Sequence, residues 1–152
     1  YEYQGTDDPL SQSRRSEAAE NLAYMREPET DMEACCSFQL LQSFALGHGV
    51  WAGLPRAQRI EQLAQIERLV DELYPTFRLF LFDGLKRYCV PLTVFGPRRA
   101  AVYFGEMYFV FTATEHIRIM TRHFDELIRA AAVQPTEVGG FVRDLRIQLE
   151  AP

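Results

Sequence analysis

The chain has 152 residues, of which 47% are hydrophobic, so its length and composition suit one folded domain with a sizeable core. Its formal net charge is −5, because the first 55 positions contain nine acidic residues and only three basic ones. This balance argues against a basic nucleic-acid-binding module, and no apolar run is long enough to span a bilayer. We therefore expect no direct nucleic acid contact and no membrane partner. We also expect a cytoplasmic protein, since the three cysteines are an odd number and no signal peptide is present.

The first thirty residues differ in character from the rest. Residues 1–30 are mostly polar and are predicted to form an arm or linker. They include a short helix over Ser11–Arg26, whose apolar stripe is narrow, and Pro28 ends it. The domain boundary is thus expected near residue 30, with residues 31–152 forming a single α+β regulatory domain.

A long helix is predicted from Met32 to Leu46. Asp31 is a suitable N-cap, and Gly47 is a suitable left-handed C-cap. The apolar residues of this segment cover most of the helix circumference, so the helix must be buried on more than one side. The second side is either the protein interior or a partner subunit. We predict a homodimer whose interface contains Phe38, Leu41 and Phe44.

The middle of the chain alternates between helix and strand signals. Trp51 lies in a glycine-rich loop, and an amphipathic helix is expected over Arg56–Tyr74. Phe77–Phe82 is apolar on both faces, which is typical of a central strand. Tyr88–Phe95 is a second strand candidate, where Pro91 indicates an edge or a bulge.

A β-hairpin is predicted around Gly105–Glu106, because glycine at the first loop position suits a type II′ turn. This turn fixes the pairing, so that Phe104 faces Met107 and Tyr103 faces Tyr108. One face of the hairpin then carries mainly aliphatic and phenyl side chains: Ala100, Val102, Phe104, Met107, Phe109 and Phe111. The other face carries Ala101, Tyr103, Tyr108 and Val110.

A strongly amphipathic helix follows over Glu115–Ala132, capped by Thr112 or Thr114, and we expect it to lie on the Phe104/Phe109 face. Thr136 is a candidate cap for a last helix. Helices kept apart from hairpin-linked strands indicate an α+β fold. The expected form is a two-layer domain with a largely antiparallel sheet of about four strands packed by helices, preceded by an N-terminal helical segment.

Catalytic and metal-binding signatures are lacking in the sequence. His116 and His123 are seven residues apart without an H-E-x-x-H pattern, and neither G-x-S-x-G nor a phosphate-binding glycine loop is present. Pairs such as Asp125 with Arg129 and Arg122 with Glu126 have the spacing of ordinary helix-surface ion pairs. We predict no catalytic residue, no metal and no cofactor.

One polar cluster points to a ligand. Arg78 stands alone in an apolar strand and needs a carboxylate, a ligand or an exit to solvent. Tyr103 and Tyr108 place phenol hydroxyls on one hairpin face, and Trp51 sits in a loop that is able to move. These four residues are the predicted binding site for a small aromatic or amphipathic acid. A second core layer or a dimer face are the alternatives for the tyrosine face.

The segments LVDELYPTFRLFLFDG, VFGPRRAAVYFGEMYFVF and TEHIRIMTRHFDELIRAA resemble the C-terminal region of bacterial transcriptional regulators of the XRE (lambda-repressor-like) family. The segment DMEACCSFQLL resembles the piece that joins this region to their helix-turn-helix domain. The strand order also resembles half of a phospholipase D-type domain, but its H-x-K-x4-D motif is absent, so that activity is not implied.

The resemblance implies a non-catalytic domain that senses an effector and dimerises, with the DNA-binding part absent from this chain. A small enzyme of an unrecognised family and a purely structural dimerisation module without a ligand are the alternatives.

Overall fold

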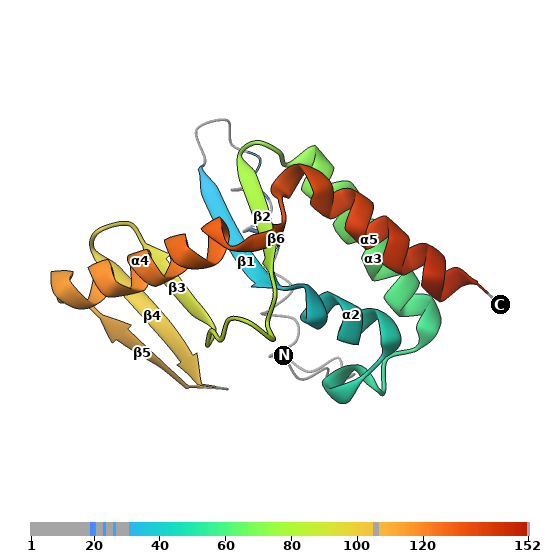
Figure 1. Cartoon of the computed structure of the whole chain (residues 1–152), viewed down its shortest axis with the longest axis horizontal. Helices are drawn as coiled ribbons and strands as arrows, with labels where there is room; N and C mark the ends of the chain where they lie inside the picture. The colour runs from blue at the N-terminus through green and yellow to red at the C-terminus, as the bar shows by residue number, and fades with distance from the viewer. Residues whose placement is uncertain (1–18, 21–22, 24–25, 27–30, 105–106, 152) are drawn as a thin grey trace.

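The computed structural model of the chain describes residues 19–20, 23, 26, 31–104 and 107–151. Its described part contains four α-helices and two three-stranded sheets, so the predicted α+β class is confirmed. Figure 1 shows one sheet in the middle of the molecule, a pair of long helices on one side of it, and the second sheet with a further helix on the other side. The predicted arm over residues 1–30 lies mostly outside the described residues.

The middle sheet has the strand order β1–β2–β6. Its strands are β1 (Met32–Ser37), β2 (Phe77–Phe82) and β6 (Ala131–Val133). β2 runs parallel to β1 and antiparallel to β6. The prediction of a central strand at Phe77–Phe82 is therefore confirmed, and its apolar character follows from the elements that lie on both sides of the sheet.

The predicted helix over Met32–Leu46 is wrong in its first half. β1 occupies Met32–Ser37, and only Phe38–Leu46 forms a helix, α2. The N-cap is Ser37, whose hydroxyl accepts a hydrogen bond from the Leu40 backbone N–H at 3.3 Å, and not Asp31. Backbone pairing with β2 competes successfully with a local helix here. The predicted C-cap is confirmed, because Gly47 has a φ of 69°.

The second sheet has the order β3–β4–β5 and is entirely antiparallel. Its strands are β3 (Leu92–Phe95), β4 (Arg99–Phe104) and β5 (Met107–Phe111). The predicted hairpin register is confirmed from Phe104 opposite Met107 to Ala100 opposite Phe111. The type II′ turn at 105–106 falls outside the described residues. The predicted strand over Tyr88–Phe95 is confirmed only for Leu92–Phe95, which is an edge strand that begins directly after Pro91.

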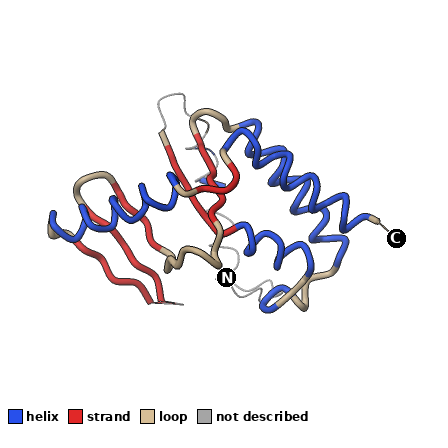
Figure 2. The backbone as a smooth tube through the Cα atoms, viewed as in Figure 1, coloured by secondary structure: helices blue, strands red, loops and turns tan. Residues whose placement is uncertain are grey.

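The prediction of a single sheet of about four strands is wrong. β2 pairs with β1 and β6, which sequence patterns did not reveal as strands, instead of joining the hairpin. Figure 2 shows the two sheets as separate groups of strands.

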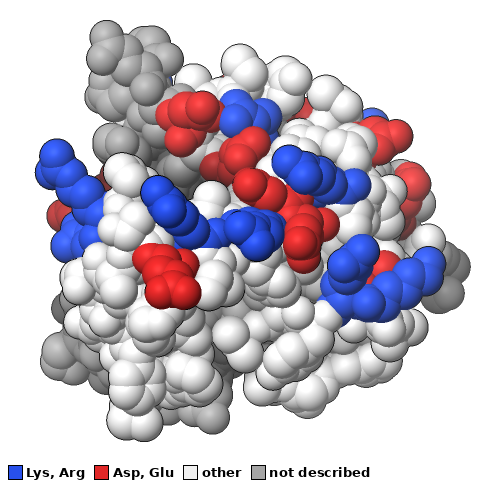
Figure 3. Space-filling model, turned by 60° about the vertical axis from the view of Figure 1, so that its left-hand side comes forward, with Lys and Arg blue, Asp and Glu red and all other residues white. Residues whose placement is uncertain are grey.

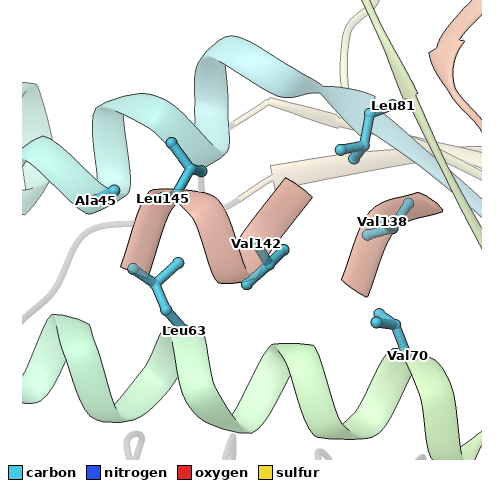
Figure 4. Close-up of a cluster of buried hydrophobic side chains, with 7 residues drawn as sticks. All are labelled: Ala45, Leu63, Val70, Leu81, Val138, Val142 and Leu145. Atoms are coloured by element: carbon cyan, nitrogen blue, oxygen red, sulfur yellow. The ribbon is translucent and has the colours of Figure 1, made fainter. Parts of the chain in front are cut away.

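The main core lies between α2, β2 and two long helices, α3 (Arg56–Glu72) and α5 (Pro135–Glu150). The predicted helix from Arg56 is thus confirmed, although it ends two residues early. α5 starts with a capping box between Gln134 and Glu137 and not at the predicted Thr136. Figure 4 shows the buried side chains between these helices: Ala45, Leu63, Val70, Leu81, Val138, Val142 and Leu145. Among the described helices, none is both long and apolar enough to cross a membrane.

The remaining helix, α4 (Thr114–Arg129), contacts strands of both sheets. Its N-cap is Ala113 and makes no side-chain hydrogen bond, so the predicted threonine capping box is not formed. The prediction that this helix covers the Phe104/Phe109 face is also wrong at the hairpin tip. Phe104, Met107 and Phe109 are all more than half exposed. Figure 1 shows why, since α4 crosses the opposite end of these strands.

The α3–α5 pair is joined on its surface by Glu67. Its carboxylate accepts hydrogen bonds from Arg143 at 2.7 Å and from Arg146 at 3.2 Å. The Arg143 hydrogen bond, together with that from Arg146, holds the pKa of Glu67 below its ordinary value of 4.5. A carboxylate with a lowered pKa stabilises the fold above its unfolded pKa, and this stabilisation is lost as the pH falls through the folded pKa.

Glu67→Gln is therefore expected to lower the free energy of unfolding at pH 7 by about 1 kcal/mol, the scale of a partly exposed ion pair. The difference between wild type and variant should shrink steadily as the pH is lowered below 4.5, where the wild-type carboxylate becomes protonated. Urea unfolding at a series of pH values measures both the stability difference at pH 7 and its decrease at lower pH. A difference that stays constant with pH would show that the ion pairs contribute nothing.

A candidate ligand groove between the two sheets

A groove of about 1730 Å³ opens between β1, the segment that leads into β3, and α4. Ligand pockets for small molecules usually measure roughly 300–1,000 Å³. The groove therefore has room for an elongated ligand, and it exists because the strands form two sheets instead of one. α4 forms one wall along its length, from Thr114 to Arg129.

The floor of the groove is apolar. Ile117 and Phe124 lie seven residues apart and therefore on the same side of α4. Val90, Leu92 and Tyr103 of β4 also line the groove. These side chains offer aliphatic and aromatic contacts with one phenol hydroxyl, as in sites that bind amphipathic molecules.

Three arginines of α4, Arg118, Arg122 and Arg129, also line the groove. Within the described part of the chain, none of the three takes part in an ion pair or a side-chain hydrogen bond, whereas Arg78, Arg143 and Arg146 all do. Each guanidinium group offers several N–H donors to an anion. Four carboxylates line the same groove, Asp31, Glu33, Asp125 and Glu126, and the first two of them are paired with Arg78.

These arginines were not recognised from the sequence as a group, because Arg122 and Arg129 have the spacing of helix-surface pairs. The predicted pairs Asp125–Arg129 and Arg122–Glu126 are not among the ion pairs that the described residues form. The signal was present in the spacing, since Arg118, Arg122 and Arg129 recur at four and seven residues and so share one side of a helix.

Three thiols lie at the β1 end of the groove: Cys35, Cys36 and Cys89. Burial raises the pKa of Cys35 to about 12, with smaller contributions from Cys89 and Cys36, and burial raises the pKa of Cys36 to about 11. Burial also raises the pKa of Cys89. At neutral pH these groups are thiols and not thiolates, so they are poor nucleophiles and poor metal ligands.

Arg78, the first predicted site residue, already has partners. Its guanidinium donates hydrogen bonds to Asp31 at 2.6 Å and to Glu33 at 3.0 Å, both next to it on the β1 side. The hydrogen bonds to Glu33 and to Asp31 raise the pKa of Arg78 above its ordinary value. Of the alternatives that the sequence left open, the carboxylate is the one observed.

The other predicted site residues are only partly brought together. Tyr103 and Tyr108 lie with ring centroids 6.0 Å apart, and Tyr103 lines the groove. Trp51 belongs to a short 3-10 helix, η1 (Gly49–Trp51), and packs against Phe44 with centroids 5.1 Å apart. Neither Arg78, Tyr108 nor Trp51 lines the groove. Of the four residues, Tyr103 alone remains in the candidate site.

The predicted dimer residues of α2 contact the protein's own core. Phe38, Leu41 and Phe44 pack on the buried cluster, and the ring centroids of Phe38 and Phe141 of α5 lie 6.3 Å apart. The interior alternative explains these three side chains. The homodimer itself stays a prediction, but the all-round apolar helix that motivated this interface is replaced by a strand and a shorter helix.

No group of three His, Cys, Asp or Glu side chains in the described residues is arranged to hold a metal ion. His116 instead lies against Phe111, with ring centroids 5.8 Å apart. Comparisons of the chain with family models, with curated proteins and with solved structures found no match.

Proposed function

We propose that this chain is the non-catalytic regulatory domain of a cytoplasmic bacterial transcriptional regulator of the XRE type, acting as a homodimer. In this proposal it binds a small aromatic or amphipathic acid in the groove between the sheets. The DNA-binding part would lie outside these 152 residues. The observation that carries the proposal is the set of unpaired arginines, Arg118, Arg122 and Arg129, beside an apolar floor.

An acid in the groove would make two kinds of contact. Its carboxylate would accept hydrogen bonds from a guanidinium group of α4, and its apolar part would lie on Ile117, Phe124 and Tyr103. Because β1 and α4 form different walls, the ligand would favour one arrangement of the two sheets over another. It shifts that equilibrium only by its difference in affinity for the two arrangements.

The alternatives have less support. A cysteine-dependent enzyme is disfavoured because Cys35 and Cys36 have raised pKa values and remain protonated at neutral pH. A purely structural module would need no unpaired arginines beside an open groove. Tyr103 and the arginines therefore favour ligand binding over both.

The test is a binding titration with acids and their uncharged amides. We expect 3-phenylpropionate, indole-3-acetate or decanoate to shift backbone NMR signals of α4 and β1, and the matching amides to bind about tenfold or more weakly, because a charge-assisted hydrogen bond contributes about 1.5–3 kcal/mol. Arg122→Ala should weaken binding of the acid by a similar factor and leave the affinity for the amide unchanged.

Arg98→Ala is the matched control, since Arg98 is exposed, has no partner among the described residues and does not line the groove. Equal affinities for acid and amide, or equal losses in the Arg122 and Arg98 variants, would refute the proposed site. Trp51 fluorescence is unsuitable as the reporter, because Trp51 does not line the groove.

A further inference from the structure

The tip of the β4–β5 hairpin exposes large apolar side chains on both of its faces. Five of them are more than half exposed: Phe104, Met107, Tyr108, Phe109 and Val110. Figure 3 shows charged side chains gathered in a band across the upper half of one face of the molecule, whereas the lower part of that face carries hardly any charge. An exposed apolar surface of this kind marks an interaction site.

The outer edge of β5 has unpaired backbone groups. The Tyr103 N–H donates a hydrogen bond to the Pro91 carbonyl at 2.9 Å, so Tyr103 directs its backbone groups toward β3. The backbone N–H and C=O groups of successive residues in a strand point to opposite edges. Val102 therefore directs its backbone groups toward β5, where it lies opposite Phe109. Within β5, Phe109 therefore bonds to β4, while Tyr108 and Val110 direct their N–H and C=O groups to the free edge.

This edge lacks the protection that the other sheet edges have. β3 is only four residues long and has a proline before it, β6 is three residues long, and β1 carries Glu33. β5 has the sequence MYFVF, with no charge and no proline, and its register with β4 is continuous. Edge strands without such features pair readily with another strand.

We propose that β5 pairs antiparallel with β5 of a second copy of this chain, across a twofold axis at Phe109. The inference rests on the homodimer of the proposed function and locates its interface. With Phe109 opposite its own copy, Tyr108 faces Val110 of the partner, and Val110 faces Tyr108. Both residues direct their N–H and C=O groups outward, so the two pairs exchange four hydrogen bonds, and the two sheets form one of six strands.

The strand is complementary to itself in three respects. The outward backbone groups lie symmetrically about Phe109, the paired side chains are apolar, and no like charges meet. A second copy therefore fits this edge better than a charged partner.

The test uses the symmetry of the axis position. Wild type should sediment as a dimer at micromolar concentration. Phe109→Glu places two carboxylates opposite each other, and Phe109→Lys places two ammonium groups there, so each variant alone should sediment as a monomer. An equimolar mixture of the two variants should form a dimer again, because opposite charges then meet. A variant that merely unfolds does not show this recovery.

Ile119→Glu is the matched control, because Ile119 and Phe109 are both 56% exposed, but Ile119 lies on α4. It should remain dimeric. As a second probe, Val110→Pro removes an outward N–H without touching the β4–β5 ladder and should raise the dimer dissociation constant at least tenfold. Circular dichroism melts verify that each variant is folded.

A dimeric wild type whose Phe109→Glu variant stays dimeric would overturn this interface and leave the proposed function standing. A monomeric wild type would overturn both the interface and the homodimer, while the acid titration would still decide whether the groove binds a ligand. Absence of recovery in the mixture of folded Glu and Lys variants would exclude a twofold axis at Phe109.

Discussion

Replacing Leu63 with alanine is expected to lower the free energy of unfolding by about 2–5 kcal/mol, the range for emptying a buried leucine site. Leu63 is 0% exposed and belongs to the cluster between α3, α5, α2 and β2. Figure 4 shows its side chain pointing from α3 toward α5. Two long helices close this site and cannot collapse into the space freely, so part of the cost comes from the cavity that remains.

Leu85→Ala makes the same chemical change at a position that is 88% exposed, and it should alter stability by less than about 0.5 kcal/mol. Urea unfolding monitored by circular dichroism compares the two variants. Because domains are typically stable by only 5–15 kcal/mol, the Leu63 variant should show a clearly lower urea midpoint. Similar midpoints would contradict the assignment of Leu63 to the core.

Arg59→Ala is expected to cost about 1.5–3 kcal/mol, because it removes charged hydrogen bonds to backbone carbonyls. The Arg59 guanidinium donates to the Leu54 carbonyl at 3.1 Å and also to the Ala45 carbonyl. Ala45 is buried in the last turn of α2, where carbonyl groups lack helical partners. The arginine thereby ties the end of α2 and the following loop to α3.

Arg68→Ala is the matched control within α3. Arg68 is exposed and makes a single long contact with Glu72 at 3.9 Å, so its loss should cost less than about 0.5 kcal/mol. Arg59→Lys should recover only part of the loss, because an ammonium group lacks the planar fork that reaches two carbonyls. Chemical unfolding of the three variants provides the comparison, and equal stability of the Arg59 and Arg68 alanine variants would disprove the capping role.

The hairpin register was predictable because two local rules agree on it. A glycine turn and a strict two-residue alternation together allow one pairing, and Phe104 opposite Met107 satisfies both. The helix from Arg56 was also predictable, because its seventeen residues are enough for a helical period to be recognised. Local patterns of this length constrain the structure strongly.

β1 was not predictable in the same way. The segment from Met32 to Ser37 is short and apolar, and such a run does not distinguish a strand from a buried helix turn. Its partner, β2, begins forty residues after β1 ends and pairs in parallel, so no turn signal links them. Because β1 was not recognised, a single sheet was expected, and the groove beside β1 was not predicted.

The candidate site was predicted only in part. Tyr103 lines the groove, but the groove lies beside α4 and not near Trp51, where the pocket was expected. Arg78 was not placed correctly, because its carboxylate partners Asp31 and Glu33 belong to the unrecognised strand. Arg122 and Arg129 of α4 were assigned to intrahelical pairs that the described residues do not form, because the side-chain contacts of a helix depend on its tertiary environment as well as on spacing.

The buried cluster comprises residues of α2, α3, α5 and β2, but none of the β3–β4–β5 sheet, which joins the remainder of the protein mainly through α4. Amide hydrogens should therefore exchange with solvent at two distinct levels. Those of α3 and α5 exchange only on global unfolding, whereas those of β3, β4 and β5 exchange through a partial opening of lower free energy. A ligand that spans α4 and β1 would slow the second class selectively, so the outer sheet is the segment of the chain whose protection responds first to binding.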